Sequence, residues 1–181
     1  MATPTPNPAP ALRLRPWRDD DLDAFFDLYS RWEVMRHLGP HPRRALQDLD
    51  EARQRLTRWH ERGTGLQPPY GLWAIVPDGE DRPVGTVLLL PLHDAAGPTD
   101  EVEIGWHVHP EHQGRGLATT AAGRLLDQVD RPVLALTDPD NHASQAVARR
   151  LGMRDEGLTD RWFGLTARQF RTVTDPGWKG P

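Results

Sequence analysis

The stretch with the most chemical potential is a glycine-rich turn, Gln113-Gly114-Arg115-Gly116-Leu117-Ala118. It lies between an alternating, strand-like run at 101–108 and an alanine-rich, helix-like run at 117–129. A glycine turn that leaves a strand and opens a helix presents free backbone N–H groups at the positive end of the helix dipole. The pattern therefore predicts a cradle for a phosphate-bearing ligand.

The turn has three other possible interpretations. A nucleotide-binding P-loop is excluded, because no Gly-Lys-Ser/Thr follows the glycines. A Rossmann dinucleotide site has partial support, with Thr119 at the third glycine and Asp138 downstream. However, residues 109–112 separate the strand from the turn, and the chain after Asp138 is too short for a second half of that sheet. A purely structural glycine turn remains as the third interpretation.

Two carboxylates on the preceding strand are candidates for acid–base chemistry. Glu101 and Glu103 are two residues apart, so their side chains point to the same face of a strand. Two carboxylates on one half-buried face raise each other's pKa, which suits a general base. The alternative is an ordinary solvated strand face.

Histidine and tryptophan offer weaker candidates. His107, His109 and His112 suggest a metal site, but Pro110 follows and no carboxylate stands at matching spacing, so we expect no metal. A pocket for a second substrate needs apolar walls. Three tryptophans are candidates for that wall, although tryptophan is more often part of a core, namely Trp32, Trp73 and Trp162.

Composition limits the class of protein. The 181 residues carry a formal net charge of −4, which argues against a nucleic-acid binder. No cysteine is present, which excludes a disulfide, a thiolate metal site and a cysteine nucleophile. No apolar run approaches the ~20 residues of a membrane span, and the first residues do not resemble a signal peptide. We therefore expect a cytoplasmic protein without a membrane or nucleic-acid partner.

The elements that must position these residues follow from hydrophobic periodicity. We expect one domain over residues 12–173, between a disordered Pro-rich tail at 1–11 and a loose tail at 174–181. The predicted order is a strand, two helices, three strands, a helix, a strand, a helix and two short strands. The expected ranges are 12–15, 22–29, 44–62, 72–76, 84–90, 101–108, 117–129, 133–136 and 141–151, with the last strands within 153–170. Leu46, Leu49, Leu56 and Trp59 are expected to form the inner stripe of the second helix, and 93–100 a turn.

Several motifs together resemble the GCN5-related N-acetyltransferase (GNAT) superfamily. Its coenzyme loop, Gln/Arg-x-x-Gly-x-Gly/Ala, is filled by Gln113, Gly116 and Ala118. The lead-in at 106–111, the helix start at 141–144 and Leu151-Gly152-Met153 are similar to further motifs of the superfamily. The opening at residues 12–16 and the Glu-Ile-Gly-Trp string at 103–106 look most like the RimJ/RimL ribosomal-protein-alanine acetyltransferase branch.

The resemblance implies a mixed α/β fold (α+β in arrangement), with a twisted, largely antiparallel sheet of six to seven strands and helices on both faces. It implies acetyl-CoA as co-substrate, a small amine or a peptide N-terminus as acceptor, and a monomer or homodimer. Glu103 would be the general base. The coenzyme would contact the backbone of His107 and Val108 and the turn with its neighbours, namely Gln113, Gly114, Arg115, Gly116, Leu117, Ala118, Asn141 and Ser144.

The sequence departs from that pattern at two positions. Ala148 stands where many members carry a tyrosine that protonates the departing thiolate, and Thr120 stands where the RimJ/RimL branch often has glutamate. The missing tyrosine keeps a second function open, namely a non-catalytic module that binds acyl-CoA. The two retained glutamates favour the enzyme.

Overall fold

Seven strands form one sheet in the computed structural model, which describes residues 9–173. The strand order is β1-β2-β3-β4-β5-β7-β6, and every neighbouring pair is antiparallel except β4 and β5. This mixed, mostly antiparallel sheet agrees with the predicted fold class. The predicted tail at 174–181 and residues 1–8 of the predicted tail at 1–11 lie outside the described residues.

The order of elements along the chain is the predicted one, with an additional short helix, α2. The strands are β1 (Leu12–Pro16), β2 (Gly71–Pro77), β3 (Gly85–Asp94), β4 (Gly97–Val108), β5 (Leu134–Thr137), β6 (Arg154–Thr159) and β7 (Ala167–Arg171). The helices are α1 (Leu22–Tyr29), α2 (Trp32–Met35), α3 (Leu49–Gly63), α4 (Leu117–Leu126) and α5 (His142–Arg150), with 3-10 turns at Asp19–Asp21 and Pro110–His112. None of the helices within residues 9–173 combines the length and apolar character that a membrane crossing requires.

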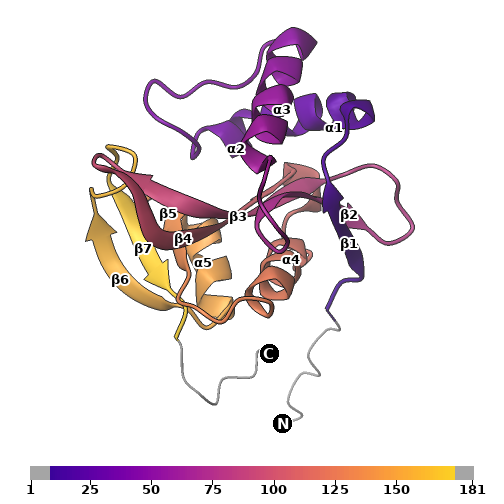
Figure 1. The fold of residues 1–181 in the computed structure, drawn as a ribbon. Coiled ribbons are helices and arrows are strands. Elements are labelled where there is room, and N and C mark those ends of the chain that lie inside the picture. The colour runs from indigo at the N-terminus through magenta and orange to yellow at the C-terminus, as the bar shows by residue number, and fades with distance from the viewer. Residues whose placement is uncertain (1–8, 174–181) are drawn as a thin grey trace.

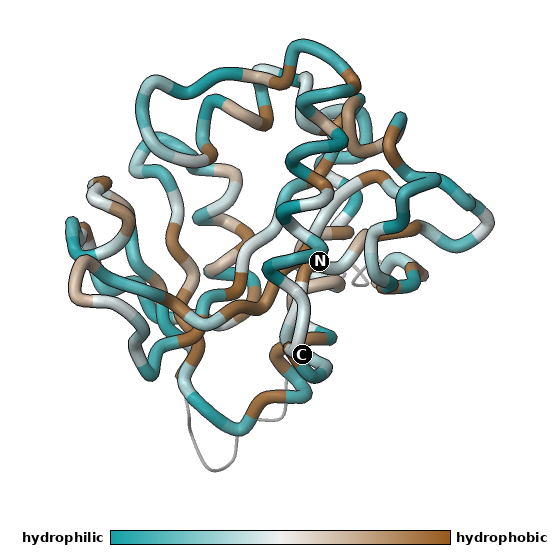
Figure 2. The backbone as a smooth tube through the Cα atoms, turned by 45° about the horizontal axis from the view of Figure 1, so that its top comes forward, coloured by the Kyte–Doolittle hydropathy of each residue, from teal (hydrophilic) through white to brown (hydrophobic). Residues whose placement is uncertain are grey.

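Helices cover both faces of the sheet. Figure 1 shows α1, α2 and α3 grouped on one side and α4 and α5 on the other. Each group closes a separate apolar core, one centred on Phe25, Leu28 and Leu56 and the other on Ile104, Ala121 and Leu125. Figure 2 shows hydrophobic residues gathered along the inner strands, whereas the outer loops are mostly hydrophilic. The sheet therefore separates two apolar cores, each covered by its own group of helices.

Strand β4 contributes side chains to both faces of the sheet, because successive side chains of a strand point in opposite directions. Val102, Ile104 and Val108 belong to the core beneath α4. Glu103 and His107 consequently face the side of α1, α2 and α3. The alternation at 101–108 that predicted a half-buried strand thus puts Glu101, Glu103 and His107 on one face of β4.

The second predicted helix starts later than expected. Helix α3 begins at Leu49, where the Asp48 carboxylate accepts a hydrogen bond from the N–H of Glu51 at 2.8 Å. Leu46 is buried from the preceding loop, whereas Leu49 is 40% exposed, so its assignment to the inner stripe was wrong. A strong N-cap fixes where the helix begins and overrides the apolar periodicity upstream of it.

The predicted turn at 93–100 is mostly strand. Strands β3 and β4 continue to Asp94 and from Gly97, leaving a tight connection between them. The register shifts between Pro91 and His93, which accommodates a proline within a long hairpin. The Pro- and Gly-rich composition therefore marks an irregularity in the hairpin and a shorter turn than expected.

Candidate active site

Strands β4 and β5 meet at one point and then diverge. The only register pair between them within residues 9–173 joins Glu103 to Leu134. Beyond that pair β4 continues to Val108 against β3 alone, while β5 pairs with β7. The carboxyl-terminal half of β4 therefore keeps one open backbone edge, as expected for a strand that accepts an extended ligand.

Backbone direction decides which residues face this open edge. The N–H of His109 donates to the carbonyl of Val84 at 2.9 Å, so His109 is directed toward the β3 side. The carbonyl of Val108 instead accepts a bond from Nε2 of Gln113 at 3.0 Å. Because backbone polar groups alternate along a strand, His107 is directed to β3 and Val108 to the open edge. Of the two predicted backbone contacts, this alternation favours Val108 and disfavours His107.

The glycine turn has the geometry of a cradle. Gly114 and Gly116 have φ of +74° and +78°, and Gly116 forms the N-cap of α4. Within residues 9–173, the N–H groups of residues 114–119 have no hydrogen-bond partner. These donors include those of Arg115, Leu117 and Ala118. A row of free N–H groups at a helix N-terminus is suited to a pyrophosphate.

Side chains around the cradle add polar groups. Arg115 is exposed, with Nη1 2.8 Å from Nδ1 of His112. The hydroxyl of Thr119 and Nε1 of Trp106 are buried without a partner in the part of the chain that the structure describes. From the sequence, Thr119 was identified only as the residue in place of a third glycine. Its place in the first turn of a glycine-capped helix was the signal that could have identified it.

The start of α5 carries two other predicted coenzyme contacts. The side-chain oxygen of Asn141 accepts a hydrogen bond from the N–H of Ser144 at 3.0 Å, which makes Asn141 the N-cap of α5. Helices α4 and α5 pack together on the same side of the sheet (Figure 1). The two helix N-termini named in the prediction thus belong to one layer.

Glu103 has an unusual environment. Burial raises the pKa of its carboxyl to about 7, and the opposing positive charge of Arg62 does not offset this. Glu101 does not contribute to the shift, because Arg171 holds it through two bonds of 3.0 and 3.1 Å. The expectation that the two carboxylates raise each other's pKa was therefore wrong. Desolvation of Glu103 alone produces the effect.

A buried network of hydrogen bonds starts from His107, which lies on the same face of β4 as Glu103. Nδ1 of His107 is 3.0 Å from the hydroxyl of Tyr29, and that hydroxyl is 2.7 Å from Oγ1 of Thr86. Trp17 donates to the same Oγ1 at 3.2 Å. Burial lowers the pKa of His107 to about 4, so its ring is neutral at pH 7. No sequence motif predicted this network of hydrogen bonds, because its members come from four separate segments of the sequence.

The three histidines have different surroundings. His107 contacts Tyr29, while Nε2 of His109 lies 3.6 Å from the carboxylate of Asp27. His112 contacts Arg115, and its ring centre lies 6.0 Å from that of His109 in an edge-to-face arrangement. Among residues 9–173 no group of three potential metal ligands occurs.

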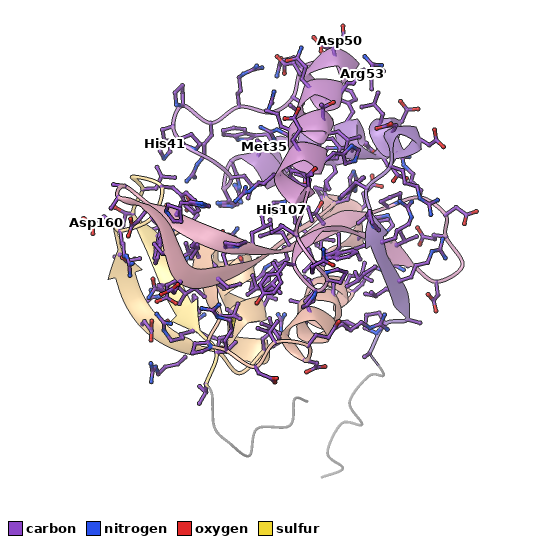
Figure 3. All side chains as sticks on the ribbon, in the orientation of Figure 1. Met35, His41, Asp50, Arg53, His107 and Asp160 are labelled. Carbon is purple, nitrogen blue, oxygen red and sulfur yellow. The ribbon has the colours of Figure 1, made fainter. Side chains whose placement is uncertain are left out.

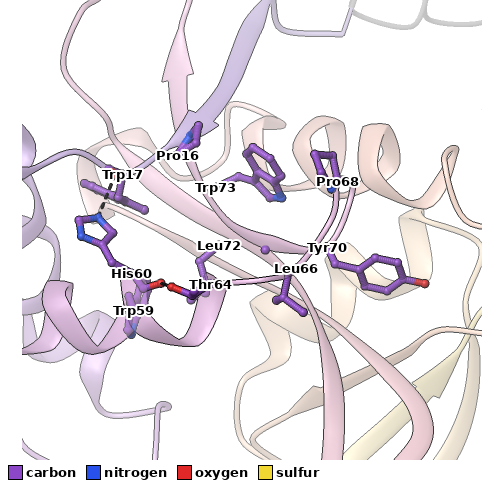
Figure 4. Close-up of a pocket in the computed structure, with 12 residues that line it drawn as sticks. Pro16, Trp17, Trp59, His60, Thr64, Leu66, Pro68, Tyr70, Leu72 and Trp73 are labelled. Atoms are coloured by element: carbon purple, nitrogen blue, oxygen red, sulfur yellow. Dashed lines mark hydrogen bonds between the residues drawn. The ribbon is translucent and has the colours of Figure 1, made fainter.

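The three tryptophans that were predicted to line an acceptor pocket lie in different environments. Trp162 is 1% exposed and belongs to a small core with Leu92 and Leu134, so its assignment to an acceptor pocket was wrong. Trp32 is exposed on α2. Trp73 lines a cavity of about 270 Å³ between the end of α3 and the start of β2 (Figure 4). The other walls of that cavity are mostly aromatic or apolar, including Trp17, Trp59, Leu66, Pro68, Tyr70 and Leu72.

Comparison with known proteins agrees with the family that the sequence motifs resemble. Residues 11–154 match the family model described as an acetyltransferase (GNAT) domain. The chain is 24% identical over 168 residues to the uncharacterized N-acetyltransferase YoaA of Bacillus subtilis, covering 89% of each chain. It is 34% identical over 61 residues to the uncharacterized N-acetyltransferase YnaD of the same species, covering 31% of this chain and 36% of YnaD.

Solved structures share the fold. Mycobacterium smegmatis RimJ in complex with CoA-disulfide superposes with a TM-score of 0.73 at 20% identity, covering 93% of this chain and 85% of that one. A GNAT-family acetyltransferase from Bacillus anthracis gives 0.71 at 20% identity, with 91% and 96% covered. RimL, the ribosomal L7/L12 α-N-protein acetyltransferase, gives 0.68 at 19% identity in its complex with coenzyme A, with 90% and 94% covered.

Proposed function

The chain belongs to the GNAT acetyltransferase family, and we propose that it transfers an acetyl group from acetyl-CoA to a primary amine. The observation that carries the proposal is the position of Glu103. It stands where β4 and β5 diverge, on the face opposite α4, with a carboxyl pKa of about 7. A general base works best when its pKa lies near the operating pH.

Acetyl-CoA would be held by the backbone on one side of the sheet. The N–H groups of residues 114–119 suit its pyrophosphate, and the edge of β4 that β5 leaves unpaired near Val108 suits the amides of its pantetheine arm. Asn141 and Ser144 at the start of α5 lie in the same layer, and we include both among the coenzyme contacts. The unpartnered hydroxyl of Thr119 is a further donor for a phosphate oxygen.

The reaction requires an uncharged amine. A primary ammonium must lose a proton before its nitrogen attacks the thioester carbonyl, and the Glu103 carboxylate would accept that proton directly or through one water. A C–N bond then forms, the C–S bond breaks, and coenzyme A leaves as a thiolate. Ala148 is fully buried where many relatives carry tyrosine, so we propose that solvent protonates this thiolate.

The test is a free-thiol assay with acetyl-CoA and a panel of amines. The panel comprises free amino acids, short peptides with a free N-terminus, polyamines and aminoglycosides. The enzyme should release thiol at a rate that depends on one class of amine, with the acetylated amine identified by mass spectrometry. Micromolar binding of acetyl-CoA without any amine-dependent release would instead support the non-catalytic acyl-CoA module that the missing tyrosine leaves open.

A further inference from the structure

Arg55 is a partly buried cation that forms no ion pair within residues 9–173. Its Nη1 lies 3.3 Å from the sulfur of Met35, a residue labelled in Figure 3. Its guanidinium carbon lies 5.8 Å from the centre of the Tyr29 ring. No carboxylate of residues 9–173 forms a salt bridge with it. A thioether and an aromatic face satisfy little of a guanidinium's hydrogen-bonding capacity, which comprises five N–H donors.

The surroundings of Arg55 further disfavour its unpaired positive charge. Burial lowers the pKa of its guanidinium, and the neighbouring cations Arg58 and Arg44 act in the same direction. The opposing effects of Tyr29 and Glu51 do not offset this lowering. The nearest carboxylate on α3, that of Glu51, is already held by Arg44 through bonds of 2.6 and 3.0 Å. Charged groups that leave water are normally paired, because an isolated charge is costly to desolvate. An anion from outside the chain would supply the missing partner.

The position of Arg55 connects it with the candidate active site. The Tyr29 ring that it covers carries the hydroxyl bonded to His107, which shares a strand face with Glu103. Arg62 follows seven residues later on α3, about 10 Å along the helix and on the same side. It has no salt bridge among residues 9–173, and its positive charge reaches Glu103. Two uncompensated arginines thus lie along α3 over the reactive face of β4.

We propose that the acceptor amine carries a carboxylate and that Arg55 binds it, with Arg62 as a second cation nearer to Glu103. This inference rests on the proposed acetyl transfer and names the substrate class of the same site. The acceptor is a free amino acid or a peptide with an acidic residue near its N-terminus. The planar guanidinium of arginine matches a carboxylate through two parallel hydrogen bonds.

The acceptor proposed here is anionic, whereas the net charge of the chain alone would favour a cationic one. The formal charge of −4 mildly favours a cationic acceptor through long-range steering, an argument that treats the surface as uniform. The face of α3 toward β4 is locally cationic instead. A close pair in a partly desolvated site outweighs a diffuse field that physiological salt screens within about 8 Å.

The test compares matched acceptors on matched variants. Each acceptor is offered with a free carboxylate and as its uncharged amide, for both amino acids and acidic dipeptides. With wild type, kcat/KM should be about 10- to 100-fold higher for the carboxylate forms. Arg55→Gln should remove this preference by raising KM, whereas Arg55→Lys should restore part of it. Whether amino acids or peptides show the larger preference distinguishes the two sources of carboxylate.

Two controls separate recognition from folding and from the reaction itself. Arg53→Gln removes an exposed arginine on α3 whose partner is Asp50, and it should leave the preference intact. Titration of each acceptor pair into protein saturated with coenzyme A gives a binding readout independent of turnover. Absence of thiol release with every amine would overturn the proposed function, whereas equal binding of carboxylate and amide forms would overturn the arginine site. Retention of the preference in Arg55→Gln would overturn it as well.

Discussion

The two sides of β4 use different parts of the chain. On the side of α4 and α5, backbone groups provide the proposed coenzyme site: the free N–H groups of residues 114–119 and the edge of β4 near Val108 that β5 leaves unpaired. On the side of α1, α2 and α3, side chains line the proposed acceptor site, including Glu103, His107 and Arg55. A backbone site needs glycine and a helix start, whereas a side-chain site needs particular residues from distant segments. The first can be predicted from a motif, whereas only Glu103 of the second was predicted in that way.

The largest expected effect tests the backbone side. Gly116→Trp should weaken acetyl-CoA binding at least 100-fold, because φ of +78° strains any side chain and the added atoms approach Pro10 and the cradle. Isothermal titration measures the dissociation constant. Gly123→Ala is the control within α4, because its added Cβ meets only an ordinary contact with Leu151 at 3.8 Å, and binding should persist. Equal affinity in Gly116→Trp and wild type would exclude the turn as the cradle.

The next effect tests the side-chain side. Glu103→Gln should lower kcat about 10- to 1000-fold and leave the affinity for acetyl-CoA nearly unchanged, because only the proton acceptor is lost. Steady-state kinetics and titration on the same preparation give both numbers. Glu101→Gln is the matched control. Because the Glu101 carboxylate is bonded to Arg171, the kcat of this variant should change by less than about 3-fold. Equal losses in the two variants would show that position on the face matters more than the perturbed pKa.

A smaller effect tests the network of hydrogen bonds beneath α3. Tyr29→Phe should lower the free energy of unfolding by about 1–2 kcal/mol, because Thr86 and His107 lose a buried partner. Denaturant titration measures the change, and the affinity for acetyl-CoA should stay constant. A large loss of coenzyme affinity in this variant would contradict the separation of the two sides.

The smallest effect separates two roles of one residue. Asn141→Ala should cost about 1 kcal/mol of stability through loss of the α5 cap. If Asn141 also contacts the coenzyme, the dissociation constant for acetyl-CoA should rise several-fold as well. Asp48→Ala removes the cap of α3 on the other side of the sheet, so it should reduce stability alone. Identical coenzyme affinity in both variants would restrict Asn141 to capping.

The comparison also explains what the sequence could predict. The fold class, the order of elements and the glycine turn depend on local signals, such as alternation at 101–108 and the glycines before α4. The start of α3 was misplaced because apolar periodicity extended past its cap, Asp48. Trp162 was misassigned because the sequence does not say whether a tryptophan lines a cavity or fills a core.

The electrostatics of the site could be predicted only in part. Glu103 was named from its strand and from a family resemblance, but the cause given for its raised pKa was wrong. Arg171, which neutralises Glu101, is 70 residues away in sequence, so nothing local announces the pair. Tyr29 and His107 are 78 residues apart, and Arg55 reaches them from a third segment. Such contacts depend on how α1 and α3 pack over β4.

The most direct test of the two-sided site is the pH dependence of kcat/KM for wild type and Glu103→Gln. Glu103 must be deprotonated to accept a proton, and burial raises the pKa of its carboxyl to about 7. The wild-type rate should therefore rise tenfold per pH unit below about pH 7 and level off above it. The variant should lack this step at every pH while still binding acetyl-CoA. The same step near pH 7 in Glu103→Gln would contradict the assignment of Glu103 as the base.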